Sequence, residues 1–172
     1  MIRVAALCAT VLVACSAPSA TTTTASIAGT TTTTTIVTPD VPSQLEGWAT
    51  TTITIAPAGS GETMDLLVAV ADEPGEREQG LMDVTDLAGL DGMLFVFDDE
   101  VSTGFWMKDT LIPLDIAFFA ANGTFVSRLT MEPCVADPCP VYGANGPYRY
   151  AVEVAGGRFE ALGDGAILAF SE

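Results

Sequence analysis

Histidine is absent from the 172-residue chain, and Lys108 is its only lysine. Without histidine the chain lacks the commonest general base and the commonest ligand of transition metals. This excludes a Ser-His-Asp triad and argues against a zinc hydrolase. Basic side chains are scarce as well, because 6 Lys and Arg accompany 22 Asp and Glu, for a formal net charge of −16. Phosphate backbones repel such a chain, so nucleic acid is not an expected partner.

Cofactor and metal motifs are also missing from the sequence. Gly157, Gly163 and Gly165 have the spacing of turn glycines and not that of a phosphate-binding loop, so no cofactor is expected. The acidic run 98–100 lacks the alternating spacing of an EF-hand loop. We interpret this run as a solvated turn, with a calcium site as the alternative, and we expect no bound metal.

The N-terminal residues have the pattern of an exported protein. One positive charge, at Arg3, precedes an apolar run over residues 4–14 that is too short to span a bilayer, which takes about 20 residues. Residues 12–15 resemble the bacterial lipobox, whose cysteine receives a diacylglycerol and becomes the first residue after cleavage. We therefore expect a signal peptide over 1–14, a lipid on Cys15, and a membrane-anchored protein that faces outside the cytoplasm. The alternatives are an ordinary signal peptide or a short core helix.

A threonine-rich segment follows the expected lipid site. From Ser16 to Pro39 there is no charged residue, and residues 21–24 and 30–35 are pure threonine runs. No apolar period of 2 or 3.6 is present, so no packed face is expected. We predict a disordered tether over residues 15–47, with or without O-glycosylation, followed by one globular domain over residues 48–172.

Two of the four cysteines, Cys134 and Cys139, remain in the expected globular domain. Outside the cytoplasm a nearby pair of cysteines is normally oxidised. A thioredoxin-like redox motif has two intervening residues and a following helix, whereas this pair has four and is flanked by prolines. The pattern favours a structural disulfide over a redox pair, free thiols or a metal site.

Hydrophobic alternation and turn residues predict an α+β fold that is mainly antiparallel β, with a small barrel-like sheet and one or two short helices. One helix is expected over residues 73–79, with Asp72 as its N-cap and Gly80 at its end, and a helical turn over 157–162. Asn122-Gly123 predicts a hairpin turn. The expected strands are Thr50–Ala56, Met64–Ala71, Gly92–Phe97, Thr103–Lys108, Leu114–Ala120, Thr124–Met131, Tyr148–Val154 and Ala166–Phe170.

Several separate motifs resemble one family. They are Glu76–Met82 (EREQGLM), Gly92–Phe97 (GMLFVF), Phe105–Thr110 (FWMKDT), Pro113–Phe118 (PLDIAF) and the Pro133–Pro140 cysteine segment. Their order and spacing from about Thr63 to Phe170 are similar to those of the family called domain of unknown function 192, also called UPF 0127. The resemblance implies a compact, mainly β fold and implies no activity. Asp109 is a departure, because the family commonly has Asn there.

The strongest candidate binding site surrounds the single lysine. On a strand, Trp106 and Lys108 share one face, and Asp115 is close in sequence. We predict a ligand surface of Trp106, Lys108 and Asp115, with Glu132 and Tyr142 at its rim. The alternatives are a Trp that closes the barrel beside a structural ion pair, catalysis by Lys108, or glycosidic acid–base work by a pair of carboxylates such as Asp115 and Glu132.

These features favour a membrane-anchored, non-catalytic module that binds an envelope glycan, peptide or protein. Histidine, a nucleophile motif and a cofactor loop are all missing from the sequence, which argues against catalysis. The main alternative is an enzyme that acts on cell-envelope polymers through carboxylates and Lys108. A third possibility is a structural stabiliser. The geometry of the Trp106–Lys108 face, open or packed, separates these hypotheses.

Overall fold

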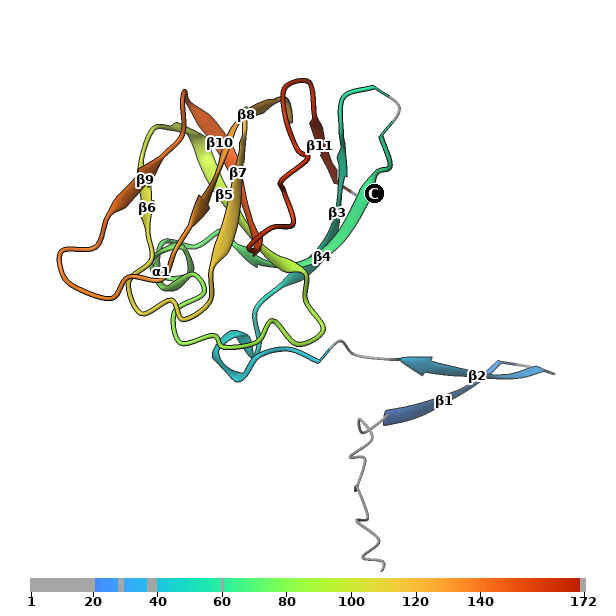
Figure 1. Ribbon diagram of the computed structural model, residues 1–172. Helices are drawn as coiled ribbons and strands as arrows, with labels where there is room; N and C mark the ends of the chain where they lie inside the picture. The colour runs from blue at the N-terminus through green and yellow to red at the C-terminus, as the bar shows by residue number, and fades with distance from the viewer. Residues whose placement is uncertain (1–20, 28–29, 37–39, 60, 171–172) are drawn as a thin grey trace, which may run out of the picture. The chain divides into compact units, whose positions relative to one another are not determined.

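The computed structural model describes residues 21–27, 30–36, 40–59 and 61–170 (Figure 1). The chain divides into two units, residues 1–38 and residues 39–172. In the first unit, strands β1 (Thr21–Ile27) and β2 (Thr30–Ile36) pair antiparallel, with Thr21 opposite Ile36. The threonine runs that we expected to be without regular structure are therefore paired strands. The predicted signal peptide and Cys15 lie outside the described residues.

The globular unit begins earlier than the boundary expected at residue 48. The 3₁₀ helix η1 (Ser43–Leu45) places Leu45 in the core with 1% of its surface exposed, and Val41 packs against the same cluster. Two apolar side chains in a short segment produce no detectable period, which is why the pattern predicted a later start.

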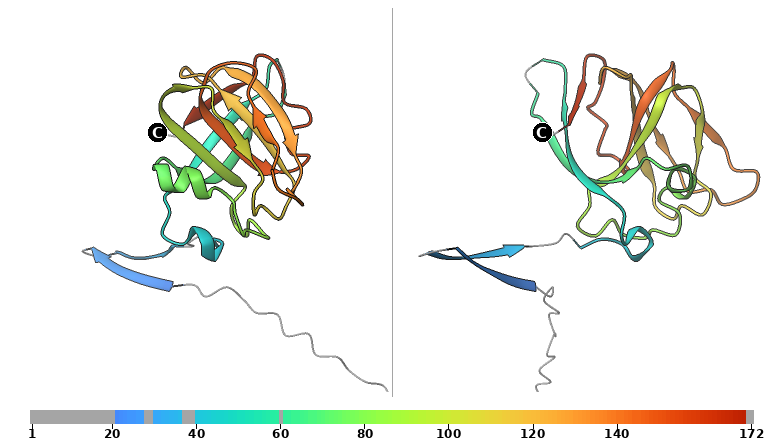
Figure 2. Two further views of the ribbon diagram at one scale, coloured as in Figure 1. Left: turned by 90° about the vertical axis from the view of Figure 1, so that its left-hand side faces the viewer. Right: turned by 180° about the vertical axis from the view of Figure 1, so that it is seen from behind.

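Seven strands form one sheet in the order β11-β3-β4-β5-β10-β7-β8. The sheet is strongly curled (Figure 2). Every neighbouring pair is antiparallel except β4 and β5, which are parallel. The edge strands meet where Thr124 pairs with Ile167, so the curled sheet is barrel-like. The sheet strands are β3 (Thr50–Ala56), β4 (Met64–Ala71), β5 (Gly92–Val101), β7 (Leu114–Phe119), β8 (Phe125–Met131), β10 (Tyr148–Ala155) and β11 (Ile167–Phe170). With one short α-helix, this confirms the predicted α+β class.

Helix α1 (Pro74–Gln79) lies in the connection between the parallel strands β4 and β5. Its N-cap is Glu73 and not Asp72 as predicted. The Glu76 carboxylate accepts hydrogen bonds at 3.2 Å from the backbone N–H groups of both Asp72 and Glu73. These bonds, in which the Glu76 side chain caps the first turn of α1, support a helix that starts one residue later than expected. Gly80, at φ 50°, ends the helix in a conformation that favours glycine.

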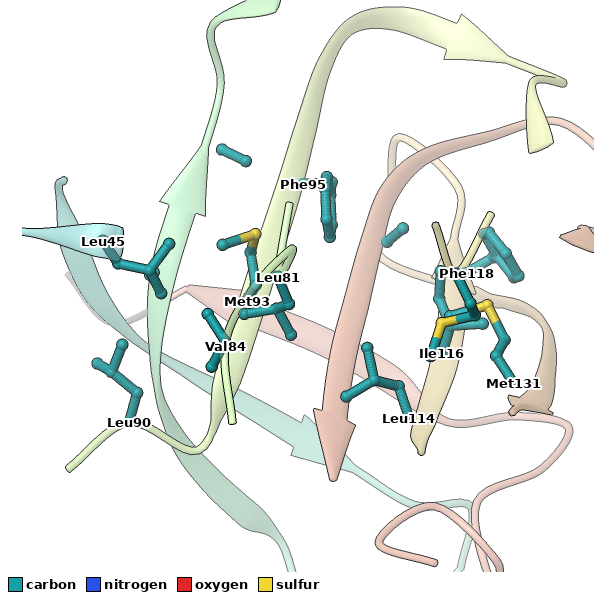
Figure 3. Packing of buried hydrophobic residues seen from close by; sticks show 14 of the residues in the cluster. Leu45, Leu81, Val84, Leu90, Met93, Phe95, Leu114, Ile116, Phe118 and Met131 are labelled. Atoms are coloured by element: carbon teal, nitrogen blue, oxygen red, sulfur yellow. The ribbon is translucent and has the colours of Figure 1, made fainter. Parts of the chain in front are cut away.

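Apolar side chains cover both faces of the curled sheet, because successive residues of a strand point to opposite faces. One cluster includes Met93, Phe95, Ile116 and Phe118 (Figure 3). The other takes Leu94, Val152 and Phe159 among its members. All six residues of β7 are buried. A sheet covered on both faces gives nearly continuous apolar runs in its inner strands, as in Leu114–Phe119, where Asp115 is the one polar residue.

Three local expectations differ from the structure. The strand expected over 103–108 is the shorter β6 (Gly104–Trp106), and Lys108 lies in a turn that continues through Asp109 at φ 53°. Residues 157–162 form turns and no helix. A strand that we did not predict, β9 (Val141–Gly143), pairs antiparallel with β6. Among the described residues, no helix is long and apolar enough to cross a membrane.

Candidate functional site

Trp106 stands open at the surface beside Lys108. The indole is 47% exposed, and the Nζ atom of Lys108 lies 5.6 Å from the ring centroid. The two residues are brought together by the turn after β6 and not by strand alternation, as we had expected. A cation at this distance over an indole is an attractive cation–π arrangement. Of the two geometries considered from the sequence, this face is the open one.

The Trp106 groove is a hollow of about 600 Å³ beside this indole. Its volume is in the range of ligand-binding clefts. Its walls come from four separate segments of the globular unit: the η1 helix, α1, the loop after α1, and the β6 turn. The groove residues are Gln44, Gly75, Glu78, Gln79, Met82, Asp83, Trp106, Lys108 and Asp109.

Hydrogen bonds between these segments fix the shape of the Trp106 groove. Gln79 donates from Nε2 to the carbonyl oxygen of Gln44 at 3.0 Å, and Gln44 donates from Nε2 to the carbonyl oxygen of Asp83 at 2.9 Å. The backbone N–H of Asp83 donates to the carbonyl oxygen of Asp109 at 2.8 Å. Each segment is therefore tied to the next, which holds the groove in one arrangement without a ligand.

Phe105 and Trp106 point to opposite faces of β6. The Phe105 ring lies 4.9 Å from that of Phe95 and 5.7 Å from that of Phe118, in edge-on contacts. Tyr142 is opposite Phe105 in the β6–β9 pair and packs against the same apolar cluster. The predicted rim residue Tyr142 therefore lies on the Phe105 side of the strand and is not a wall of the Trp106 groove.

Asp115 does not belong to the surface that we predicted for it. It is 1% exposed. Its carboxylate accepts hydrogen bonds from Thr130 Oγ1 at 2.7 Å and from the backbone N–H of Phe159 at 2.8 Å. Both bonds join parts of the fold, and Asp115 lies on the sheet face opposite Leu114 and Ile116, which pack in the Phe95 cluster. The expected partnership of Asp115 with Lys108 is wrong.

Glu132 is exposed beside the cysteine loop. Cys134 and Cys139 form the predicted disulfide bond. Glu132 and Tyr142 border a shallow hollow of about 300 Å³ against this loop, which shares no residue with the Trp106 groove. The carboxylates of Asp115 and Glu132 therefore do not converge on one site, and glycosidic chemistry by this pair has no geometric support.

Glu153 is a buried acid that the sequence reasoning did not single out. It lies on β10 between Met93 of β5 and Ile116 of β7, and it is 4% exposed. Burial raises the pKa of Glu153 to about 8. The signal in the sequence is a single acid within the run Tyr150–Ala155, whose other members are apolar or aromatic.

A small cavity of about 30 Å³ is lined in part by Glu153. We call it the Glu153 cavity. It shares Glu78, Gln79, Met82 and Trp106 with the Trp106 groove, so the two hollows adjoin. The remaining lining residues of the Glu153 cavity are Arg77, Gly80, Leu81, Phe95, Phe105, Thr110 and Glu153.

Outside these two hollows, most charged side chains of the described residues form no ion pair and no cluster. Over the described part of the chain, the ion pair is Arg158 with Asp91, at 3.2 Å. The same residues contain no cluster of three or more Cys, Asp or Glu side chains placed to hold a metal ion. The run 98–100 is exposed, but it lies within β5 and not in the solvated turn that we expected, since the strand continues past Phe97 to Val101. Glu100 accepts a hydrogen bond from the backbone N–H of Ala121 at 2.9 Å.

Solved structures with a similar fold include the following two. A crystal structure from Sinorhizobium meliloti 1021, described as that of a candidate transcription regulator, has a TM-score of 0.63 and 33% identity, and the match covers 72% of this chain and 95% of that chain. A protein of unknown function from Novosphingobium aromaticivorans DSM 12444 has a TM-score of 0.65 and 24% identity, with 78% and 94% covered. The second likeness concerns the fold alone.

No curated protein matches the sequence. The family profile DUF192, described as Uncharacterized ACR, matches residues 55–166. That range runs from β3 to the residue before β11 and includes Trp106, Lys108 and Glu153. Because the match spans more than half of the chain, this protein belongs to the DUF192 family.

Proposed function

We propose that the globular unit is a non-catalytic glycan-binding module, held at the outer face of the cell membrane by a lipid on Cys15. The observation that carries the proposal is the exposed Trp106 indole in a preformed groove of about 600 Å³. An indole offers a large flat apolar surface for the apolar face of a sugar ring.

Polar groups around the indole suit the hydroxyl groups of a glycan. Lys108 donates hydrogen bonds, and the carboxylates of Glu78, Asp83 and Asp109 accept them. Three carboxylates and one ammonium group disfavour an anionic ligand, whereas an uncharged ligand with donors and acceptors can pair with both kinds of group. The interlocked segments keep these groups in place, which lowers the ordering cost of binding.

Two other functions receive less support. An enzyme that uses Asp115, Glu132 and Lys108 would need those groups in one site, and Asp115 is committed to Thr130 and Phe159. Transcription regulation, the description given to the Sinorhizobium meliloti protein, would usually involve DNA. The formal net charge of −16 opposes binding to phosphate backbones.

Calorimetric titration of the full chain in detergent tests the glycan proposal. The probes are the uncharged β-1,4-linked hexasaccharides of glucose and of N-acetylglucosamine. We expect binding of at least one hexasaccharide, and a loss of at least tenfold in affinity for Trp106→Ala. Leu111→Ala is the matched control, since Leu111 is also a large exposed apolar residue, at 54%. Absence of binding to both hexasaccharides, or equal effects of the two substitutions, would contradict the proposal.

The lipid anchor has its own test. Cells that express the chain are labelled with an alkyne fatty acid, and the protein is examined for incorporation and for membrane fractionation. We expect labelled, membrane-bound protein for the parent sequence and unlabelled, released protein for Cys15→Ala. Cys8→Ala, a second cysteine in the same N-terminal region, is the control and should remain labelled. Labelling that persists in Cys15→Ala would refute the anchor.

A further inference from the structure

The carboxyl group of Glu153 faces the Glu153 cavity and not a protein partner. No hydrogen bond reaches it from the described residues, and burial alone is the cause of its raised pKa. Among those residues, no fully buried side-chain oxygen or nitrogen lacks a partner. A carboxyl group without a protein partner must therefore extend into the open space that it lines, where a water molecule or a ligand can reach it.

The surroundings of Glu153 keep the carboxyl group neutral at pH 7. Its cross-strand neighbours Met93 and Ile116 are apolar and fully buried. Helix α1 contributes the two other titratable groups of the cavity, Arg77 and Glu78. The Arg77 guanidinium donates to the carbonyl oxygens of Val96, at 2.9 Å, and Asp72. It forms no ion pair with Glu153.

Besides the neutral carboxyl group of Glu153, the hydroxyl group that lines the cavity belongs to Thr110, and it is hydrogen-bonded to the backbone. Its Oγ1 donates to the carbonyl oxygen of Lys108 at 3.3 Å. A neutral carboxylic acid carries one O–H donor. The Glu153 cavity therefore presents a donor at its base that the protein itself does not use.

The walls and the size of the Glu153 cavity restrict what that donor can bind. Phe95, Phe105 and Trp106 contribute aromatic surface. The volume of about 30 Å³ is roughly twice what a single water molecule requires. A group of two or three heavy atoms fits, with an acceptor oxygen for the carboxyl group and an apolar part against the rings. A carbonyl oxygen bonded to a methyl-bearing carbon meets both requirements.

We propose that the Glu153 cavity is the subsite for the acetyl portion of the acetamido group of an N-acetylated amino sugar whose ring stacks on Trp106. The inference rests on the proposed glycan binding and specifies its substrate class. Glu153 donates a hydrogen bond to the carbonyl oxygen, and the methyl group contacts Phe95 and Phe105. The adjoining Trp106 groove holds the rest of the glycan.

Two uncharged hexasaccharides test this specificity. The β-1,4-linked hexamers of N-acetylglucosamine and glucose differ in having an acetamido or a hydroxyl group at each C2, so the net charge of the protein does not bias the comparison. Titration of the full chain in detergent at pH 6.5 should give roughly 3- to 10-fold tighter binding of the acetylated hexamer, the effect of about one hydrogen bond. Equal affinity for the two hexamers would overturn the subsite while leaving glycan binding intact.

Three variants connect the preference to Glu153. Glu153→Gln keeps a donor and should retain the preference, whereas Glu153→Met has a similar length without a donor and should lose it. Trp106→Ala should lower the affinity for both hexamers by a similar factor. If Glu153→Met still unfolds cooperatively and keeps the parent's preference for the acetylated hexamer, the cavity does not recognise the acetamido group.

The pH dependence gives a second readout on the same proteins. The preference of the parent should fall as pH rises from 6.5 to 9, because ionised Glu153 has no proton to donate. Glu153→Gln should keep a constant preference over the same range. If the two proteins lose preference in parallel, another group controls recognition and the role of Glu153 is wrong. Failure of both hexamers to bind at any pH would instead remove the glycan proposal itself.

Discussion

Asp115 joins two distant parts of the barrel, because its Oδ2 atom accepts a hydrogen bond at 2.8 Å from the backbone N–H of Phe159. Phe159 is fully buried in the turn segment between β10 and β11. The other carboxylate oxygen, Oδ1, accepts from Thr130 on β8. One side chain on β7 thus fixes the loop that follows β10 and the neighbouring strand. This role is structural and occurs on the sheet face away from the Trp106 groove.

Asp115→Ala should lower the free energy of unfolding by about 2–3 kcal/mol, because it leaves the buried N–H of Phe159 without an acceptor. Urea unfolding followed by circular dichroism measures the change. Thr130→Val, which removes one of the two bonds and keeps the shape, should cost about 1 kcal/mol. Glycan affinity should be unchanged in both variants. If Asp115→Ala loses glycan affinity while its free energy of unfolding is unchanged, Asp115 contributes to the ligand surface after all.

Glu153 should make stability fall as pH rises. Its pKa in the folded protein is about 8, above the ordinary value of 4.5, so folding favours the protonated form. The contribution is fully present below pH 4.5 and is lost progressively up to about pH 8, because the unfolded chain ionises first. The total loss is at most about 5 kcal/mol, since one pKa unit corresponds to roughly 1.4 kcal/mol.

Glu153→Gln isolates this effect from the other acids of the chain. The difference in unfolding free energy between the parent and Glu153→Gln should shift in favour of the variant between pH 4.5 and pH 8. Asp65→Asn is a suitable control, because Asp65 is an exposed acid on β4. A constant difference between the parent and Glu153→Gln would mean that Glu153 ionises normally in the fold.

Much of the fold is readable from the sequence wherever one local rule decides the conformation. The bounds of β3 and β4 are those predicted, because alternating Thr and Ile in β3 and an apolar run after a polar loop in β4 mark the strands. The hairpin at Asn122-Gly123 also follows its turn residues. Lys108 was misplaced because Asp109 adopts a positive φ without a glycine to signal the turn.

The site was harder to predict because tertiary contacts create it. Trp106 and Lys108 were correctly expected to lie together. The contribution of Gln44 to the groove could not be foreseen, because Gln44 is far from Trp106 in the sequence. Asp115 was assigned by its closeness in sequence to Lys108, although strand alternation points it to the other face of the sheet. Glu153 could have been found, since an acid amid apolar strand residues is unusual.

The disulfide bond between Cys134 and Cys139 should stabilise the fold by about 2 kcal/mol, because it closes a short loop in the unfolded chain. Cys134→Ser, Cys139→Ser and the double variant should lose the same amount, since each removes the same bond. Urea unfolding measures the loss, and alkylation before and after reduction, read by peptide mass spectrometry, identifies the oxidised pair. Additive losses in the double variant would argue against a shared bond.

Phe105 and Trp106 are adjacent on β6, and truncation of Phe105 should lower stability far more than truncation of Trp106. Phe105 contacts the rings of Phe95 and Phe118 in the apolar cluster, so Phe105→Ala should cost about 3 kcal/mol of unfolding free energy. Trp106 is 47% exposed, so Trp106→Ala should cost less than about 1 kcal/mol.

Glycan affinity completes the comparison between these neighbours. Trp106→Ala should lose binding of the glucose hexamer while it remains folded. Phe105→Leu, which preserves most of the packing, should retain binding of that hexamer through the indole, because glucose has no acetamido group to contact Phe105. Denaturation and titration on the same preparations give both quantities. If Trp106→Ala destabilises the fold as strongly as Phe105→Ala, the indole closes the end of the barrel. Its exposure would then reflect packing at an edge, and the groove beside it would not be a binding surface.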